Sequence, residues 1–186
     1  MITASQKRKE NIAEYLLYMW QIEDIIRAND LDISKIEKSI IDKYLDLTPE
    51  QRKEMTEWYE SLIDMMRRED VQQSGHLQLN KNIIVQLVEL HQALLKDPRF
   101  PDYTAEFYKT LPYIVELRSK AGDNKVGEIE TCFNALYGML LMRLAHKDIT
   151  PATQEAVAQI SKFIALLARN FHLDESDKLF THEENG

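Results

Sequence analysis

Apolar residues recur every three or four positions along nearly the whole chain, which is the spacing of amphipathic helices. The pattern predicts an all-α fold, a single bundle of six or seven mostly antiparallel helices. We expect them at residues 5–28, 33–45, 49–70, 80–96, 103–121, 126–146 and 151–171.

Two helix starts are marked by capping residues. In Thr48-Pro49-Glu50-Gln51, threonine suits the N-cap, proline the first helical position, and Gln51 the reciprocal position of a capping box. Asn80 is the expected cap of the helix over 80–96. The first of these is the clearest start signal in the chain.

The last two predicted helices are the most apolar on all sides, at GMLLMRLA (138–145) and FIALLA (163–168). A helix that is apolar on more than one face is buried on more than one side. The short connection between them predicts an antiparallel hairpin, which we place at the centre of one domain over 1–173. Residues 174–186 are expected to form an acidic, frayed tail.

Composition agrees with this class. The chain has 186 residues, 44% of them hydrophobic, enough for a sizeable core. Only five glycines and five prolines occur, too few for the many turns of an all-β sandwich. Abundant Glu, Lys, Leu, Ile, Gln and Met favour helices.

The charge balance narrows the list of partners. The formal net charge is −8, whereas nucleic-acid binding requires a basic stripe that displaces phosphate counterions. Anionic membrane surfaces are disfavoured for the same reason. The longest apolar run is far shorter than the roughly 20 residues that span a bilayer. We therefore expect neither a nucleic-acid nor a membrane partner.

Cys132 is the single cysteine, so an internal disulfide framework and a cysteine-built zinc site are excluded. The N-terminus is polar and then charged, with no apolar signal-peptide core. Together these features predict a cytoplasmic protein.

No motif for a cofactor or for catalysis is present. A di-iron bundle needs Glu-x-x-His on two helices, and no histidine here has glutamate three positions before it. Catalytic triads and phosphate-binding glycine loops are also missing. We expect no metal and no cofactor.

Two ionisable residues interrupt apolar stretches. Glu23 lies on the apolar stripe of the first predicted helix, and Arg143 interrupts the most apolar helix of the chain. One interpretation is that Arg143 reaches solvent and Glu23 lies at a face boundary. A second is that the two form a buried pair, and a third that Arg143 binds an anionic ligand in an inter-helix pocket.

Three further side chains have both structural and functional interpretations. His91 lies one helical step from Leu87 and Leu94, as a neutral core histidine or a ligand-binding group. Tyr18 and Trp20 lie off the main stripe of their helix. They are core packing or, if exposed, anchors of a protein interface.

The stretch QKRKENIAEYLLYMWQIEDIIRA, residues 6–28, resembles the opening of a Bacteroidetes family of uncharacterised proteins, catalogued as a domain of unknown function. The resemblance extends to the ending TPATQEAVAQISKFIALLARNF. It implies a single helical domain of bacterial origin and supplies no catalytic residues.

The sequence does not indicate a particular biochemical reaction. The preferred hypothesis is a non-enzymatic, cytoplasmic interaction or regulatory module that binds a protein partner or self-associates. The alternative is a small-molecule binder or an enzyme with a polar inter-helix pocket built from Glu23, His91 and Arg143.

Overall fold

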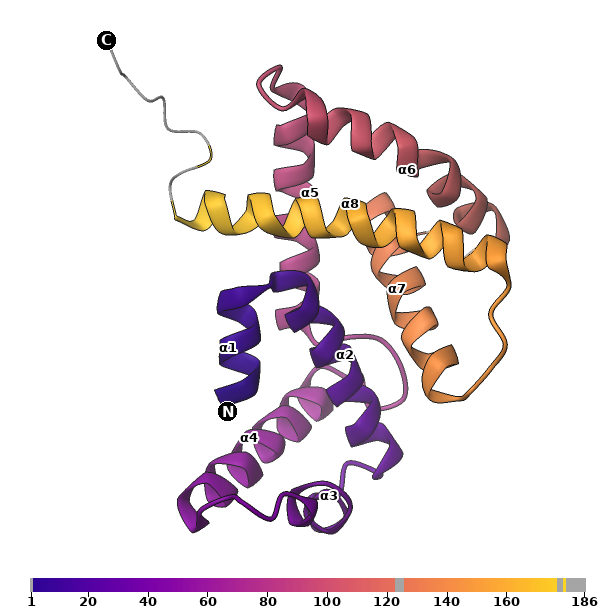
Figure 1. Cartoon of the computed structure of the whole chain (residues 1–186). Coiled ribbons are helices and arrows are strands. Elements are labelled where there is room, and N and C mark those ends of the chain that lie inside the picture. Colours follow the sequence, from indigo (N-terminus) through magenta and orange to yellow (C-terminus); the bar gives the residue numbers. More distant parts are fainter. Residues whose placement is uncertain (1, 123–125, 177–178, 180–186) are drawn as a thin grey trace. The chain divides into compact units, whose positions relative to one another are not determined.

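The computed structural model describes residues 2–122, 126–176 and 179. Over these residues it consists of eight α-helices and one short 3-10 helix, with no strand, so the predicted all-α class is confirmed (Figure 1). The helices are α1 (Ile2–Glu10), α2 (Ile12–Ala28), α3 (Ile33–Ser39), the 3-10 helix (Ile41–Lys43), α4 (Pro49–Arg68), α5 (Gln78–Lys96), α6 (Pro101–Lys120), α7 (Glu128–Leu144) and α8 (Pro151–Glu175).

The chain divides into two compact units. The first comprises Met1–Glu10 and Glu14–Ile83, and the second comprises Asn11–Ala13 and Ile84–Gly186. Helix α5 begins in the first unit and continues into the second. The expectation that residues 1–173 act as one domain stays a prediction.

Helix α4 of the first unit follows the local signals of its sequence. Thr48 Oγ1 accepts from Gln51 N at 3.2 Å, and Gln51 Oε1 accepts from Thr48 N at 3.0 Å. Both bonds of the predicted capping box are therefore present. The face that α4 buries is Met55, Tyr59, Leu62, Ile63 and Met66.

The first predicted helix, over 5–28, is wrong as one element because it breaks at Asn11. The Asn11 side-chain oxygen accepts from Ala13 N at 3.0 Å. In the second unit, His172 Nε2 also accepts from Ile12 N at 3.1 Å. The first N–H groups of a helix have no partner within the helix. These two acceptors bind two such groups, those of Ile12 and Ala13, and so allow α2 to begin at Ile12.

The helix predicted over 33–45 is shorter in the structure. Helix α3 ends at Ser39, and the tighter 3-10 helix Ile41–Lys43 follows it. Ile40, between them, has φ −124° and ψ −62°, outside helical geometry. Ile36 and Ile41 are nevertheless fully buried, so both short elements contribute to the core of their unit.

In the second unit, α8 is the central helix. It packs against both α6 and α7 (Figure 1). One face of it is a buried apolar row. The row consists of Ile160, Phe163, Ile164, Leu167 and Ala168.

Helix α7 is less central than the hairpin prediction requires. It packs against α8 after the short connection 145–150, but its buried residues run from Ile129 to Met139. Further along, Leu141 and Leu144 are 42% and 57% exposed. The apolar run of α7 thus continues beyond the part of the helix that its unit covers.

The end of the chain is only partly described. Helix α8 continues through Glu175, two residues into the predicted tail, while most of 174–186 lies outside the described residues. Among the helices that the structure describes, none has the length and apolar character needed to cross a membrane.

Candidate functional site

Glu23 of α2 is completely buried, with 0% of its surface exposed. Its Oε1 accepts from Leu77 N at 2.9 Å and from Asn80 Nδ2 at 2.7 Å. Its Oε2 lies 2.6 Å from His76 Nδ1, which donates the third hydrogen bond. A carboxylate can remain in a core when such donors replace the water that it has lost.

These bonds fix the start of α5. Leu77 immediately precedes the helix, so Glu23 acts as a long-range cap of its first turn. A second carboxylate, Glu69 Oε2, accepts from Gln78 N at 2.5 Å. Negative charge is favourable at a helix N-terminus because the first N–H groups and the helix dipole both face it.

Asn80 was predicted to cap this helix, and that prediction is wrong. The helix begins at Gln78, two positions earlier, and Asn80 is 0% exposed inside its first turn. Its amide nitrogen donates to Glu23 instead. The carboxylates that accept hydrogen bonds from the N–H groups at the start of α5 come from other parts of the chain. A local sequence pattern therefore could not predict them.

Arg27 lies one turn after Glu23 on α2 and holds the connection between α4 and α5. Its Nη2 donates to Val71 O at 3.2 Å and also to Gly75 O, and its Nη1 donates to Asp24 at 2.9 Å. Gly75 has φ +86°, a left-handed conformation that suits glycine. Glu23 and Arg27, which we call the α2 clamp, thus fix the connection and the helix that follows it.

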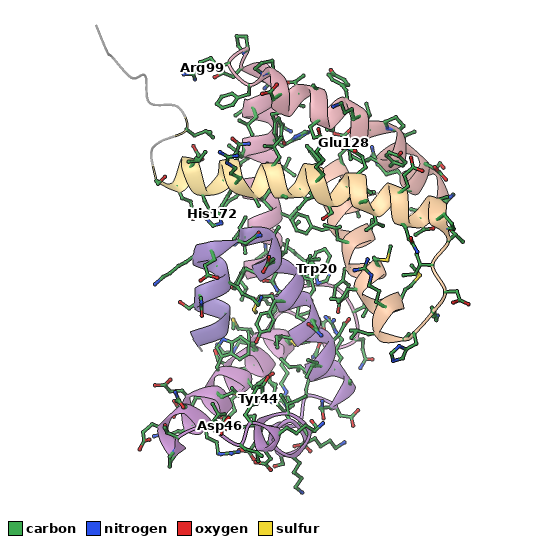
Figure 2. All side chains as sticks on the ribbon, viewed as in Figure 1. Trp20, Tyr44, Asp46, Arg99, Glu128 and His172 are labelled. Carbon is green, nitrogen blue, oxygen red and sulfur yellow. The ribbon has the colours of Figure 1, made fainter. Side chains whose placement is uncertain are left out.

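Trp20 is 2% exposed and stacks on His76, with ring centroids 4.2 Å apart and planes at 12° (Trp20 is labelled in Figure 2). An interface anchored by Trp20 is therefore wrong, because the indole belongs to the core. Tyr18 is half-buried, and burial raises its pKa to about 12.

His76 is the most chemically suggestive group at this site. In many enzymes a carboxylate hydrogen-bonds to one imidazole nitrogen and so orients a histidine that acts as a general base. A nucleophilic mechanism also needs a hydroxyl or thiol bonded to the ring. Among the described residues, the His76 ring contacts the Glu23 carboxylate and the Trp20 indole.

His91 of α5 lies in an aromatic core in the second unit. It is 4% exposed, and its Nδ1 lies 2.7 Å from Tyr103 Oη. The rings of Phe107 and Phe163 lie 4.7 and 5.8 Å from it, centroid to centroid. Burial lowers the pKa of His91 to about 4, so the imidazole is neutral at pH 7.

Arg143 does not share a pocket with His91. It is exposed in the last turn of α7. Glu128, at the opposite end of α7, is the acid nearest His91, with Oε2 at 3.9 Å from Nε2. At about 1.5 Å per residue, the two ends of α7 are about 22 Å apart. The predicted pocket of Glu23, His91 and Arg143 is therefore wrong for its last two members.

The buried Glu23–Arg143 pair stays a prediction, because the two residues lie in different units. Glu23 receives its three donors from His76, Leu77 and Asn80, all in its own unit. Arg143 is solvent-exposed, as the first interpretation from the sequence had it, but Glu23 is fully buried and does not lie at a face boundary.

One hollow of the first unit has a volume of about 610 Å³. It includes neither Glu23 nor Trp20. The described residues contain no group of three or more His, Cys, Asp or Glu side chains that could hold a metal ion. The residues lining the hollow are Asp30, Leu31, Asp32, Ile33, Glu60, Ile63, Asp64 and Arg67.

Comparison with known families gives one match. The model of the "Domain of unknown function (DUF4924)" matches residues 1–178. The chain belongs to this family. The match covers the two stretches on which the resemblance was based, and it assigns no activity. No curated protein and no solved structure matches the chain.

Sequence reasoning found Glu23 in this DUF4924 chain but missed His76, Leu77 and Asn80 as its partners. These residues lie more than fifty positions further along the sequence, at and just before the start of α5. The only available signal was the acid itself, which had to find donors somewhere if its helix face was buried.

Proposed function

We propose that this DUF4924 chain is a non-enzymatic interaction module of the bacterial cytoplasm, and that it binds a protein partner through the end of α7. The observation that supports this is the exposure of Leu141 and Leu144, at 42% and 57%, in one of the most apolar of the described helices. We call residues Tyr137, Leu140, Leu141 and Leu144 the α7 patch.

The α7 patch has the composition of a binding surface. Leu141 and Leu144 lie one turn apart on the helix, with Tyr137 and Leu140 half-buried beside them. Arg143 is exposed between the two leucines. Contiguous apolar surface marks interaction sites, and tyrosine and arginine are enriched there. The chemistry fits a partner that presents an apolar helix face with an acidic rim.

The buried polar groups support a structural module rather than an enzyme. The carboxylate of Glu23 is satisfied by donors from its own unit, and the imidazole of His91 by Tyr103. Burial raises the pKa of Cys132 to about 12, so its thiol is an unreactive core group that suits a reducing compartment. A net charge of −8 supports a protein partner over a nucleic acid.

The experiment is a paired capture from cytoplasmic extract of the native source, with the whole chain as bait. Wild type is compared with Leu141→Glu/Leu144→Glu and with a matched control, Leu45→Glu, which alters a leucine that is 88% exposed in the first unit. We expect a partner that binds wild type and the control alike and is lost from the α7 variant.

The proposal fails if the same proteins bind all three baits, or if the α7 variant and wild type differ in nothing that mass spectrometry detects. Circular dichroism of the variants checks that each one is folded, which we expect because the altered side chains are exposed.

A further inference from the structure

The outer face of α6 carries a second surface, distinct from the α7 patch. Tyr108 and Val115 are 62% and 57% exposed, although both are large apolar side chains. The opposite face of the same helix is buried in its unit through Tyr103, Phe107 and Ile114. The outer residues, which we call the α6 stripe, are Ala105, Tyr108, Pro112, Val115 and Ser119, and all of them are exposed.

The spacing of the α6 stripe is that of a helix–helix seam. Its positions follow one another at intervals of three, four, three and four residues, which is the a/d pattern of a coiled coil. A solvent-facing helix surface normally carries charged residues at such positions. Here the stripe has none, and the charges lie beside it.

The flanking charges are self-complementary. Lys109 and Glu116 are one heptad apart, so they lie on the same flank of the stripe. They lie on opposite sides of Pro112 along the helix. In an antiparallel pair of identical helices, like flanks meet, and a two-fold axis near Pro112 brings Lys109 of each copy against Glu116 of the other.

A parallel pair has no such match. There the flank with Lys109 and Glu116 meets the opposite flank, which carries Thr104, Leu111 and Arg118. In register, Lys109 lies opposite Thr104 and Glu116 lies opposite Leu111. The charge pattern therefore favours an antiparallel second copy over a parallel one.

The existing partners of these charges leave them available. Lys109 Nζ lies 3.8 Å from Glu106 Oε2, and Glu116 Oε1 accepts from Lys120 Nζ at 2.6 Å. The side chains of Lys109, Glu116 and Lys120 are all more than 60% exposed. Exposed pairs of this kind contribute little and can rearrange when a better partner arrives.

We propose that the α6 stripe is a self-association surface, on which a second copy of this chain docks antiparallel about a two-fold axis at Pro112. Tyr108 of each copy then packs beside Val115 of the other, and two Lys109–Glu116 pairs flank the contact. The stripe provides far fewer residues than the roughly 20–30 per side of a standard interface. The dimer is therefore weak and dissociates on dilution.

The test is sedimentation velocity of the full-length chain over a concentration series, with charge-reversal variants. Wild type is expected to show a reversible monomer–dimer equilibrium. Lys109→Glu alone sets two carboxylates against each other at both pairs, and Glu116→Lys alone sets two ammonium groups against each other. Each is expected to weaken association roughly tenfold or more, because like charges then meet. An equimolar mixture of the two variants restores opposite charges at both pairs and should recover the dimer.

Lys53→Glu is the matched control, since Lys53 is an exposed lysine of α4, 78% exposed, in the first unit. It should associate as wild type does. Leu141→Glu/Leu144→Glu separates this proposal from the α7 patch, because it should leave the dimer intact even if it removes a captured partner.

A wild-type chain that stays monomeric at every concentration overturns the proposal. So does a dimer that both single reversals leave unchanged, or a mixture of the two that stays monomeric. A dimer abolished by the α7 variant and not by the reversals assigns self-association to α7 instead.

Discussion

Glu23 and His91 are two buried ionisable side chains that are stabilised in opposite ways. Glu23 is surrounded by donors: a backbone amide, a carboxamide and an imidazole. His91 is surrounded by rings, with Tyr103 Oη at hydrogen-bond distance from Nδ1 and Phe107 and Phe163 against its ring. Both residues interrupt apolar stripes that look alike in the sequence.

The two cores accommodate an ionisable side chain by different means. The first unit supplies Glu23 with hydrogen bonds, because an unpaired carboxylate in a core is very costly. The second unit supplies His91 with apolar packing, and burial lowers the pKa of His91 to about 4, which removes its charge. One polar residue therefore ties separate segments together, and the other packs as an aromatic ring.

The largest expected effect comes from deleting the carboxylate. Glu23→Ala leaves Leu77 N and the Asn80 amide buried without their acceptor, and it removes the partner of His76. We expect a loss of about 3–5 kcal/mol in the free energy of unfolding, the range for breaking a buried charged network. Urea denaturation followed by circular dichroism measures it.

The matched control is Glu14→Ala on the same helix, since the Glu14 side chain is 62% exposed. It should cost less than about 1 kcal/mol. Equal losses for the two variants would show that Glu23 has no special place in the core.

The His91 core is tested through pH. The folded-state pKa of His91 is about 4, below the usual 6.5, so protonation favours the unfolded state. Above pH 6.5 the residue is neutral in both states and has no effect on stability. As the pH falls from 6.5 to about 4, wild type should lose up to about 3 kcal/mol through this residue.

His91→Phe cannot take up that proton. Its stability should therefore fall less steeply than that of wild type between pH 6.5 and about 4, and the difference between the two curves isolates His91 from all other titrating groups. Parallel curves would show that His91 is not held neutral in the core.

The smallest expected effect belongs to Arg143. Because its side chain is exposed, Arg143→Met should change stability by less than about 0.5 kcal/mol. Combined with Glu23→Gln, its effect should add to that of the single change within about 0.5 kcal/mol. A coupling energy above about 1 kcal/mol would instead support a buried Glu23–Arg143 pair.

Local signals in the sequence predicted the structure well where the structure is itself local. The capping box at Thr48 and Gln51 was predicted because both partners lie within one helical turn. The break at Asn11 was missed because neither glycine nor proline marks it: residues 5–11 read SQKRKEN. One acceptor of the second start, His172, lies 160 positions away.

The candidate site was predicted only in part. Glu23 was a candidate because a carboxylate in an apolar stripe requires hydrogen-bond donors if that helix face is buried. Its partners could not be inferred, because the pairing depends on how α2 meets the start of α5. The exposure of Arg143 agrees with the interpretation that its side chain reaches solvent. The prediction that failed is the burial of the apolar run around it, because the structure leaves Leu141 and Leu144 exposed.

The most direct test of the account is the hydrogen exchange of the Leu77 amide, measured by NMR in wild type and in Glu23→Gln. If Glu23 caps α5, the Leu77 amide is protected in wild type and exchanges much faster in the variant, while the Gln51 amide, capped by Thr48, keeps its protection. Unchanged protection at Leu77 would contradict the assignment of Glu23 to this role.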